Sequence, residues 1–486
     1  MSLIERGASR LARWWRGRRG TWWWAIVVIV VPVAVVAGTA VTLLLSLVDA
    51  GDPRNQIELI RTGLTVGAGT GGVVALVLAG RRQWSTEHDA TERRMTELYV
   101  KAVEQLGSDK AAVRHGGLYA LERVAQDNPD HRQTVVNVLC GYLRGPFIPP
   151  GEQRPHQRRG LRRPLAPVSR SVVSKRQAGQ PESRTVAGLY DEAGQEREVR
   201  LTAQRILAAH LIPGEDRNHP VDTFWVDIAL DLTGATLIDF DLRHAQLQTA
   251  TFTNATFIGD ARFTNTSFAG DAWFNEASFT RAARFGEASF TKSVEFTETT
   301  FNGPAEFSRA TFTGPGSCSR TTFAGPARFV EATFIGSVEF AEATFAGPAE
   351  FTETSFCGRA EFSRAAFARN AEFTEASFTE NARFGGATFS GDAEFTETTF
   401  TRNGGFIKAT FIGRAEFGGA SFTENARFSG ASFTRYAQFT RARFHRKPDF
   451  RDVVFERGVP ESLRAHVTTE NDQPGADEAP DETEHG

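Results

Sequence analysis

The feature that most constrains the fold of this chain is a large apolar residue that recurs every five or six positions through its C-terminal half. Leucines recur every five residues from Leu232, and from Phe257 to Phe455 the spacing alternates six and five without a break. Of the 38 repeat positions between 252 and 455, all are Phe except Cys318. Two residues before each of these stands a small residue, which is Ala in 27 of the 38 cases.

This spacing excludes an α-helix, because steps of five and six residues at 100° each scatter the Phe side chains around the helix axis. In an extended chain, residues i and i−2 project to the same side, so each Phe and its preceding small residue point inward together. The sequence therefore predicts short extended segments joined by turns.

Individual repeats resemble those of the pentapeptide-repeat family. GATLI and HAQLQ, in residues 234–248, match the family unit A(D/N)LXX, and NATFI and EASFT are its Phe version. The resemblance implies a mainly β fold, a right-handed quadrilateral β-helix in which the central Leu or Phe and the small residue fill the interior. We assign residues 232–458 to this β-helix.

The alternation of five and six departs from the family's usual coil of 20 residues and predicts a coil of two 11-residue units, or 22 residues. The extra residue often brings Gly, Pro or Asp, as in Gly303–Pro304 and Gly391–Asp392. Because these residues favour turns, we place it at a corner of the coil.

The repeat centres are predicted to form a structural core. The first ten assigned to it are Leu237, Leu242, Leu247, Phe252, Phe257, Phe263, Phe268, Phe274, Phe279 and Phe285. Cys318, at a Phe position, is expected to be a buried thiol that leaves slack, and Cys357 is expected to face outward.

The outward positions predict two kinds of face, one lined by Ser and Thr and one by charged residues. Stacking at 22 residues places Arg284 beside Glu306 and Glu306 beside Arg328. Residues 251–455 hold 23 Asp and Glu against 21 Lys and Arg. Some members of the family inhibit DNA gyrase with a strongly acidic rod, and this near-neutral rod lacks that feature, so nucleic-acid mimicry or binding is disfavoured.

Two uncharged stretches near the N-terminus, residues 22–48 and 62–80, predict a two-span transmembrane hairpin over residues 21–80. Residues 1–20 form a basic tail with six Arg and one Glu. Because positively charged segments stay on the cytoplasmic side, this tail predicts a multi-pass protein of the cell membrane with both termini in the cytoplasm.

Gly63, Gly67 and Gly71 repeat every four residues within the second stretch. This small-xxx-small spacing predicts close packing of the two membrane helices. Residues 67–72 also fit GxGxxG, but no soluble strand precedes them, so a dinucleotide site is disfavoured.

Three soluble segments are expected between the hairpin and the β-helix. Residues 81–150 predict three short helices with turns at Gly107–Asp109 and Asp127–Asp130, and Ser108 or Asp109 is a candidate cap of the second helix. Residues 151–192 predict a basic, disordered linker, whose residues 154–176 either stay solvated or attract anionic lipid. Residues 193–231 predict a helix over Glu196–Leu211 and an N-terminal cap that includes Phe224 and Trp225.

Residues 459–486 predict a short cap followed by an acidic, disordered tail. From Glu470 onward this tail has seven acidic residues and no Lys or Arg. We consider a transient pairing of the tail with the basic linker a hypothesis.

The sequence predicts a non-enzymatic protein without cofactor or metal, because no His, Cys and carboxylate cluster is evident and the three Cys are widely spaced. Through the stretches TELYVKAVEQLGSDKAAVRHGGLYALERVAQDNP, VRLTAQRILAAHL and IALDLTGATLIDFDL, about three quarters of the chain resembles bacterial two-span pentapeptide-repeat proteins. This resemblance implies a scaffold in the cytoplasm for an unidentified protein partner, anchored in the lipid bilayer. A DNA-mimicking, gyrase-protecting role is the alternative, and association into a homo-oligomer is left open.

Overall fold

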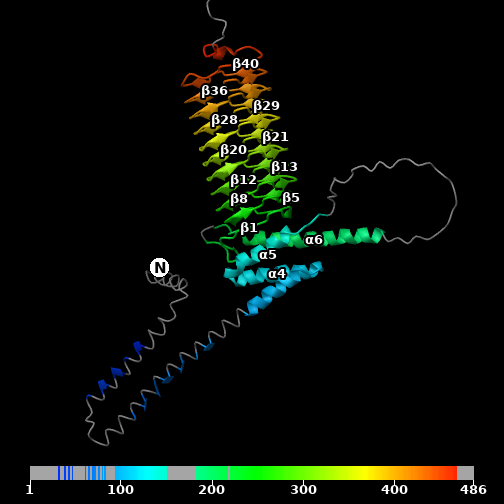
Figure 1. Ribbon diagram of the computed structural model, residues 1–486, viewed down its shortest axis with the longest axis vertical. Helices are drawn as coiled ribbons and strands as arrows, with labels where there is room; N and C mark the ends of the chain where they lie inside the picture. The colour runs from blue at the N-terminus through cyan, green and yellow to red at the C-terminus, as the bar shows by residue number, and fades with distance from the viewer. Residues whose placement is uncertain are drawn as a thin grey trace, which may run out of the picture. The chain divides into compact units, whose positions relative to one another are not determined.

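The computed structural model describes residues 93–149, 182–216 and 219–467, together with scattered helical positions between 31 and 83. The chain divides into two compact units, Met1–Glu97 and Leu98–Gly486. The second unit contains a small helical domain and a long β-helix, coloured from green to red in Figure 1.

The predicted membrane hairpin falls almost wholly on residues outside these ranges. Within the part of the chain that the structure describes, no helix is long and apolar enough to cross a membrane. The two uncharged stretches, 22–48 and 62–80, contribute only isolated positions to the described residues. The hairpin, the basic tail 1–20 and the linker segment 154–176 stay predictions.

The helical domain has the predicted helices and turns. Residues 98–106 are helical, and they are followed by α4 (Ala111–Asp127), the 3₁₀ turn η1 (Pro129–His131) and α5 (Arg132–Arg144). The predicted cap of the second helix is wrong, because the N-cap is Lys110 and has no side-chain cap bond. Ser108 Oγ instead accepts a hydrogen bond from the amide of Lys110, which closes the turn before the helix.

The helix before the β-helix, α6, extends over Glu182–His210. It is longer than the predicted Glu196–Leu211, and its first residues occupy the end of the range that we assigned to the linker 151–192. The reason is composition, because residues 182–195 hold good helix formers such as Ala, Glu and Leu and no proline after Pro181. Its C-terminal half packs against α4 and α5.

The β-helix has four parallel sheets, here called faces A to D, and the chain visits them in the repeating order B, C, D, A. Face A contains β1 (Leu230–Asp231), β4 (Ala250–Thr251), β8 (Ala272–Trp273), β12 (Val294–Glu295), β16 (Gly316–Ser317), β20 (Val338–Glu339), β24 (Ala360–Glu361), β28 (Ala382–Arg383), β32 (Gly404–Gly405) and β36 (Ala426–Arg427). Face B contains β2 (Thr236–Ile238), β5 (Thr256–Ile258), β9 (Ser278–Phe279), β13 (Thr300–Phe301), β17 (Thr322–Phe323), β21 (Thr344–Phe345), β25 (Ala366–Phe367), β29 (Thr388–Phe389), β33 (Thr410–Phe411), β37 (Ser432–Phe433) and β40 (Val454–Phe455).

The other two sheets follow the same plan. Face C contains β6 (Ala261–Arg262), β10 (Ala283–Arg284), β14 (Ala305–Glu306), β18 (Ala327–Arg328), β22 (Ala349–Glu350), β26 (Ala371–Glu372), β30 (Ala393–Glu394), β34 (Ala415–Glu416) and β38 (Ala437–Gln438). Face D contains β3 (Gln246–Leu247), β7 (Ser267–Phe268), β11 (Ser289–Phe290), β15 (Thr311–Phe312), β19 (Thr333–Phe334), β23 (Ser355–Phe356), β27 (Ser377–Phe378), β31 (Thr399–Phe400), β35 (Ser421–Phe422) and β39 (Arg443–Phe444). A 3₁₀ turn, η2 (Glu461–Leu463), follows the last strand.

The strand register confirms the 22-residue coil and shows how it begins. The first coil has the family's usual 20 residues, since Thr236 pairs with Thr256. After a 21-residue step from Gln246 to Ser267, the register settles at 22, as in the pairing of Ser289 with Thr311. The coil length therefore changes where the repeat spacing in the sequence changes.

The two kinds of repeat step form two kinds of corner. A six-residue step has a three-residue bend between strands, as in residues 280–282, so the extra residue lies at a corner as predicted. A five-residue step has a β-turn, in which the amide of Ala288 donates to the carbonyl of Phe285. The type of corner therefore follows from the number of residues between successive repeat centres.

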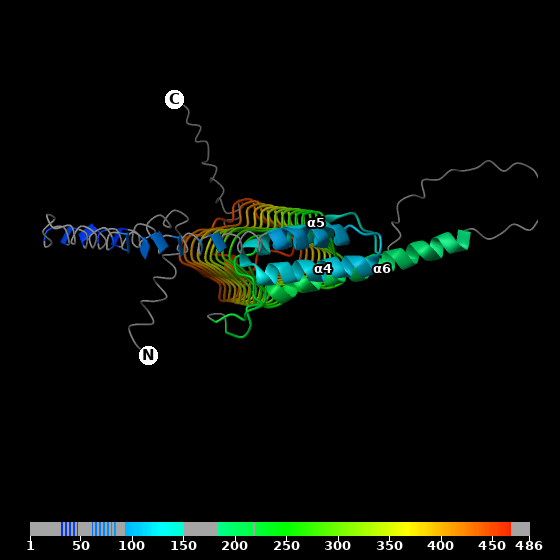
Figure 2. The ribbon, with the colours of Figure 1, turned by 90° about the horizontal axis from the view of Figure 1, so that it is seen from below.

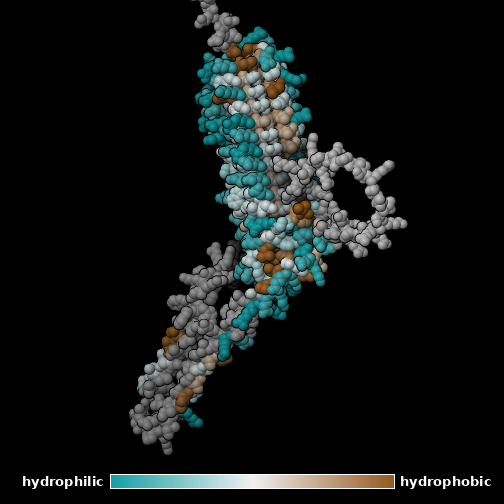
Figure 3. Space-filling view, turned by 45° about the vertical axis from the view of Figure 1, so that its right-hand side comes forward, coloured by the Kyte–Doolittle hydropathy of each residue, from teal (hydrophilic) through white to brown (hydrophobic). Residues whose placement is uncertain are grey.

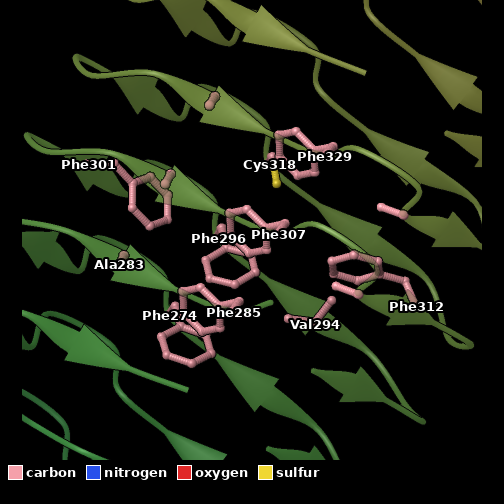
Figure 4. Close-up of a cluster of buried hydrophobic side chains, with 14 of the residues drawn as sticks. Phe274, Ala283, Phe285, Val294, Phe296, Phe301, Phe307, Phe312, Cys318 and Phe329 are labelled. Carbon is pink, nitrogen blue, oxygen red and sulfur yellow. The ribbon is translucent and has the colours of Figure 1, made fainter. Parts of the chain in front are cut away.

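The Phe side chains stack in columns inside the coils (Figure 4). Phe285 and Phe307 stack at a centroid distance of 4.8 Å, and Phe296 meets Phe307 edge-on at 5.5 Å. Each such aromatic pair contributes roughly 0.5–1.5 kcal/mol beyond the burial of its area. The repeated core therefore supplies the cohesion of the β-helix along its whole length.

Three helices lie across the N-terminal end of the β-helix (Figure 2). α5 contacts β1 and β2, and α4 and α6 pack on α5. Trp225 is fully buried there and its indole Nε1–H donates to Gln126 Oε1 at 3.0 Å. Phe224 is 7% exposed, so both aromatic residues are buried.

Candidate functional surfaces

The ten predicted core residues are all interior. Leu237, Leu242, Leu247, Phe252, Phe257, Phe263, Phe268, Phe274, Phe279 and Phe285 are each at most 1% exposed. They contact one another and leave nothing for a ligand to touch. Any binding by the β-helix therefore takes place on its outward positions.

The structure separates the three cysteines by environment. Cys140 and Cys318 are buried and Cys357 is exposed. Burial raises the pKa of the Cys140 thiol to about 12, and burial also raises the pKa of Cys318 far above its ordinary value. Both thiols are therefore protonated at neutral pH, which removes them as nucleophiles.

The glycines predicted to pack membrane helices are not brought against a partner in the described residues. Gly63 and Gly67 lie outside those residues. Gly71 is helical, and no described atom outside its immediate surroundings lies within 4 Å of the position that a Cβ would take. Their role in helix packing stays a prediction.

The outward strand positions divide the β-helix into two uncharged and two charged faces. On faces B and D, the residue before each Phe is Ser or Thr in nearly every coil. On faces A and C it is charged in most coils, and these two faces alternate with B and D around the coil. Figure 3 shows a hydrophilic band running along the β-helix beside a paler strip.

The left-handed turns add two further columns of charge. The second residue after Phe in each five-residue step has a positive φ, and from Asn265 to Asp452 these positions recur every 11 residues. The non-Gly residues there are Asn265, Glu276, Glu287, Glu298, Arg309, Arg320, Glu331, Glu342, Glu353, Arg364, Glu375, Glu397, Lys408, Arg441 and Asp452. A left-handed conformation costs an L-residue roughly 1–2 kcal/mol, so the fold imposes this geometry on side chains that do not favour it.

Ion pairs between neighbouring coils connect many of these charges. Arg309 contacts Glu331 at 3.1 Å, and Arg364 contacts Glu342 at 2.6 Å. The predicted stacking of Arg284, Glu306 and Arg328 is confirmed by the strand register. Of the two predicted pairs only Glu306 and Arg328 are within ion-pair distance, at 3.8 Å, because Arg284 contacts Asp260 instead at 2.8 Å.

Face C also carries a run of like charges in register. Glu350, Glu372, Glu394 and Glu416 are direct neighbours in successive strands. Burial raises the pKa of Glu372, and the charge of Glu350 raises it further. The pKa of Glu394 is raised by burial and then by Glu372 and Glu416. Like charges directly opposite one another are destabilising, so this run costs the fold free energy.

The run is incompletely neutralised. Arg328 contacts Glu350 at 3.2 Å and Arg414 contacts Glu416 at 3.9 Å, which places cations at its two ends. Among the residues that the structure describes, no cation lies within ion-pair distance of Glu372 or Glu394. The middle of face C is therefore an outward-facing, half-buried acidic strip on a β-helix of nearly balanced charge.

Hydrogen bonds of buried threonines inside the β-helix were not predicted. Five of the small inward positions are Thr, each with 0% exposure: Thr266, Thr299, Thr321, Thr354 and Thr398. Their hydroxyls donate to a backbone carbonyl in the preceding coil, as Thr299 does to Phe274 at 2.6 Å. Their inward direction follows from their position two residues before the repeat centre, but the sequence does not show which carbonyl each hydroxyl binds.

The helical domain holds a polar cluster that sequence reasoning also missed. Arg200 is 2% exposed and donates to the carbonyls of Leu143 and Gly145 at the C-terminal end of α5, and to Glu196. Tyr142 donates to the same carboxylate, and burial followed by the hydrogen bond to Glu196 raises its pKa well above the usual range. Since a cation stabilises a helix C-terminus, the cluster has a structural role.

His210 connects α4 with the segment between α6 and β1. Its Nδ1–H donates to the carbonyl of Thr223 at 2.6 Å, and Nε2 lies 2.8 Å from Glu122 Oε1. Its ring stacks on Trp225 at 4.0 Å. Within the described ranges no group of three His, Cys, Asp or Glu side chains is arranged to hold a metal ion.

Comparison with known proteins identifies the repeats. The sequence model for pentapeptide repeats (9 copies) matches residues 242–289, 285–333, 329–377, 351–399, 373–421 and 395–443. These overlapping stretches cover the β-helix from within its first coil almost to its end, so the chain carries pentapeptide repeats in a parallel β-helix. Searches of curated proteins and of solved structures each found no match.

Proposed function

We propose that this chain is a non-enzymatic protein anchored in the cell membrane, which holds its β-helix in the cytoplasm and presents face C to a protein partner with a basic surface. The acidic run of face C is the observation that carries the proposal. Four stacked glutamates cost stability and contribute no contact to the core, so their presence is explained by an interaction outside the fold.

The anchoring rests on the sequence. Residues 22–48 and 62–80 are uncharged, and the Arg-rich segment before them favours a cytoplasmic N-terminus. An even number of spans returns the chain to the same side, so the β-helix and its partner share the cytoplasm. Basic residues 154–176 would then lie near the inner leaflet, where each contributes about 1 kcal/mol of attraction to anionic lipid.

Membrane anchoring is tested by fractionation and protease access. We expect the full chain to stay in the membrane pellet after alkaline extraction, and its β-helix to be cleaved in inverted vesicles only. Release into the supernatant, or protection of the β-helix in inverted vesicles, would overturn the anchoring or the orientation.

The partner is tested by proximity labelling from the full chain in cells. The variant carries Glu350→Gln, Glu372→Gln and Glu394→Gln, and the matched control carries Glu295→Gln, Glu339→Gln and Glu361→Gln, which occupy the same strand position on face A. We expect proteins labelled by the wild-type chain to be lost at least five-fold in the face C variant and kept in the control. Equal labelling by both variants would contradict the assignment of the partner to face C.

A gyrase-directed DNA mimic is the second candidate, and the same in-register glutamates are the observation that favours it. Against it stands the balance of 23 acidic and 21 basic residues over 251–455. Addition of the purified chain to a supercoiling reaction decides between them, because a scaffold leaves the reaction unchanged and a mimic inhibits it or protects the enzyme.

A further inference from the structure

The C-terminal end of the β-helix differs from its other coils in burial. Phe285, Phe307 and Phe329 in the middle are at most 1% exposed, whereas Phe444 and Phe455 in the last coil are only partly buried. Val454 is 53% exposed. Among the described residues, only the short 3₁₀ turn η2 lies beside β40 in Figure 1, whereas α4, α5 and α6 lie at the opposite end.

The backbone of the last coil also ends without partners. One coil earlier, the amides of Phe417 and Gly419 donate to the carbonyls of Gln438 and Thr440. The equivalent amides of the last coil, Phe439 and Arg441, make no hydrogen bond to the residues that the structure describes. An open sheet edge of this kind pairs readily with another extended segment.

A depression of about 770 Å³ lies at this end, and its lining combines apolar and basic side chains with the carboxylates of Asp449 and Asp452. Phe455, Val459 and Val467 contribute apolar surface, and Lys447 and Arg451 contribute cations. The short turn η2 covers only part of the end, through Leu463, which is fully buried.

The end of the β-helix is strongly basic. Residues 435–467 contain eight Lys and Arg against four Asp and Glu. The eight cations are all exposed: Arg435, Arg441, Arg443, Arg446, Lys447, Arg451, Arg457 and Arg464. Only Arg451, with Asp449, forms an ion pair among the described residues.

The next residues of the chain have the opposite charge. Residues 468–486 contain seven Asp and Glu and no Lys or Arg, and they follow directly from Val467 at the rim of the depression. At about 3.3 Å per residue, a segment of 19 residues spans roughly 60 Å, which is ample to fold back across the end of one coil.

We propose that the acidic segment 468–486 docks on the basic C-terminal end of the β-helix of the same chain and covers its open edge. Its carboxylates neutralise the exposed arginines, and its backbone supplies partners to the amides of Phe439 and Arg441. The docking surface proposed here differs from the basic linker, with which we paired the tail in the sequence analysis. The inference does not depend on the proposed function.

Zero-length carbodiimide cross-linking of the full chain tests the proposal, because this reagent joins a carboxylate directly to a lysine amine. Lys447 is exposed at the basic end, Lys292 is an exposed lysine about seven coils away, and Lys175 lies in the linker. We expect tail peptides joined to Lys447 at least ten times more often than to Lys292 or Lys175. Predominant links to Lys175 would assign the tail to the linker and overturn the proposal.

A second measurement reports on the edge without the reagent. We expect hydrogen exchange of the backbone amides of residues 437–445 to accelerate at least three-fold when all seven tail acids are changed to Asn or Gln. We expect the same acceleration for the wild-type chain in 1 M salt, because the screening length falls to about 3 Å. Exchange of residues 305–312 is the internal control. Unchanged exchange at 437–445, or links found only between labelled and unlabelled copies of the chain, would overturn docking within one chain.

Discussion

The two ends of the β-helix meet the same physical problem and solve it differently. At the N-terminal end, Gln204 pairs with the edge strand β2, because its amide nitrogen donates to the carbonyl of Ile238 and its Oε1 accepts from the amide of Ile238. Gln133 does the same for Ala229 beside β1. At the C-terminal end, no such side chain within the described residues pairs with the last strands.

The two ends therefore differ in how their edge strands are paired. A glutamine that pairs at two points takes the place of a neighbouring strand, so the helical domain covers the edge of the first coil. The C-terminal end has only η2 and partly buried apolar residues. Since each coil contacts only its neighbours, a weak end affects the coils beside it and leaves the rest intact.

The largest expected effect contrasts Trp225→Ala with Phe455→Ala. Trp225 is fully buried between the helices and the first coil, so we expect its removal to cost about 3–5 kcal/mol. Phe455 is only partly buried, so we expect Phe455→Ala to cost less than half as much free energy of local opening. The free energy of local opening from native-state hydrogen exchange, read at residues 228–248 and at 450–456, measures both, and equal losses at the two ends would contradict the comparison.

The next effect concerns the glutamine cap. Gln204→Met keeps the volume of the side chain and leaves the amide and the carbonyl of Ile238 unpaired in a buried site, at a cost of about 1–3 kcal/mol for each group. Gln438→Met, on the outward side of β38, is the matched control and should be near neutral. Urea unfolding followed by circular dichroism compares the two, and a neutral Gln204→Met would show that water replaces the cap.

The sequence predicted the β-helix because its signal is repeated. The Phe spacing defined the inward positions, the 22-residue coil and the corner that holds the extra residue, and each is seen in the register. What it missed is local: nothing in Glu276 or Arg309 announces a left-handed backbone, since these residues avoid it when isolated. The tertiary stacking overrides their preference.

The N-terminal cap was only partly predictable for a different reason. Phe224 and Trp225 were recognisable as apolar residues before the first repeat, but Gln133 and Gln204 are ordinary helix residues in the sequence. Their role depends on how α5 and α6 lie on the first coil, a contact between segments roughly 100 and 34 residues apart in the chain. The acidic run of face C was hidden similarly, because its charge averages out over the sequence.

A third effect compares amide exchange at the two ends of face D. The amide of Gln246 in the first coil donates to Leu211 O, and that of His445 in the last coil donates to Phe422 O. Because Gln246 lies beneath the helical domain and His445 beside the open end, we expect exchange at least ten-fold slower at Gln246. The measurement uses the chain truncated after Val467, so that the tail plays no part, and similar rates would show that the two ends open alike.

The smallest effect is a dependence on pH at the C-terminal end. The hydrogen bond from the Arg451 side chain lowers the pKa of Asp449 to about 2, and the Arg451 amide contributes as well. The pKa of an unfolded Asp is about 3.9. The carboxylate therefore stabilises the folded end fully above pH 4, and this contribution disappears as the pH falls from 4 to 2. We expect the protection factors of residues 449–456 to fall over this interval in the wild-type chain and to stay level in Asp449→Asn, because Asn does not titrate.

Asp231, at the N-terminal end, also has a lowered pKa. Burial raises its pKa, but the hydrogen bonds from Thr233 and the charge of Arg144 outweigh this effect. If the N-terminal end lost protection at a higher pH than the C-terminal end, the helical domain would not be the more robust cap.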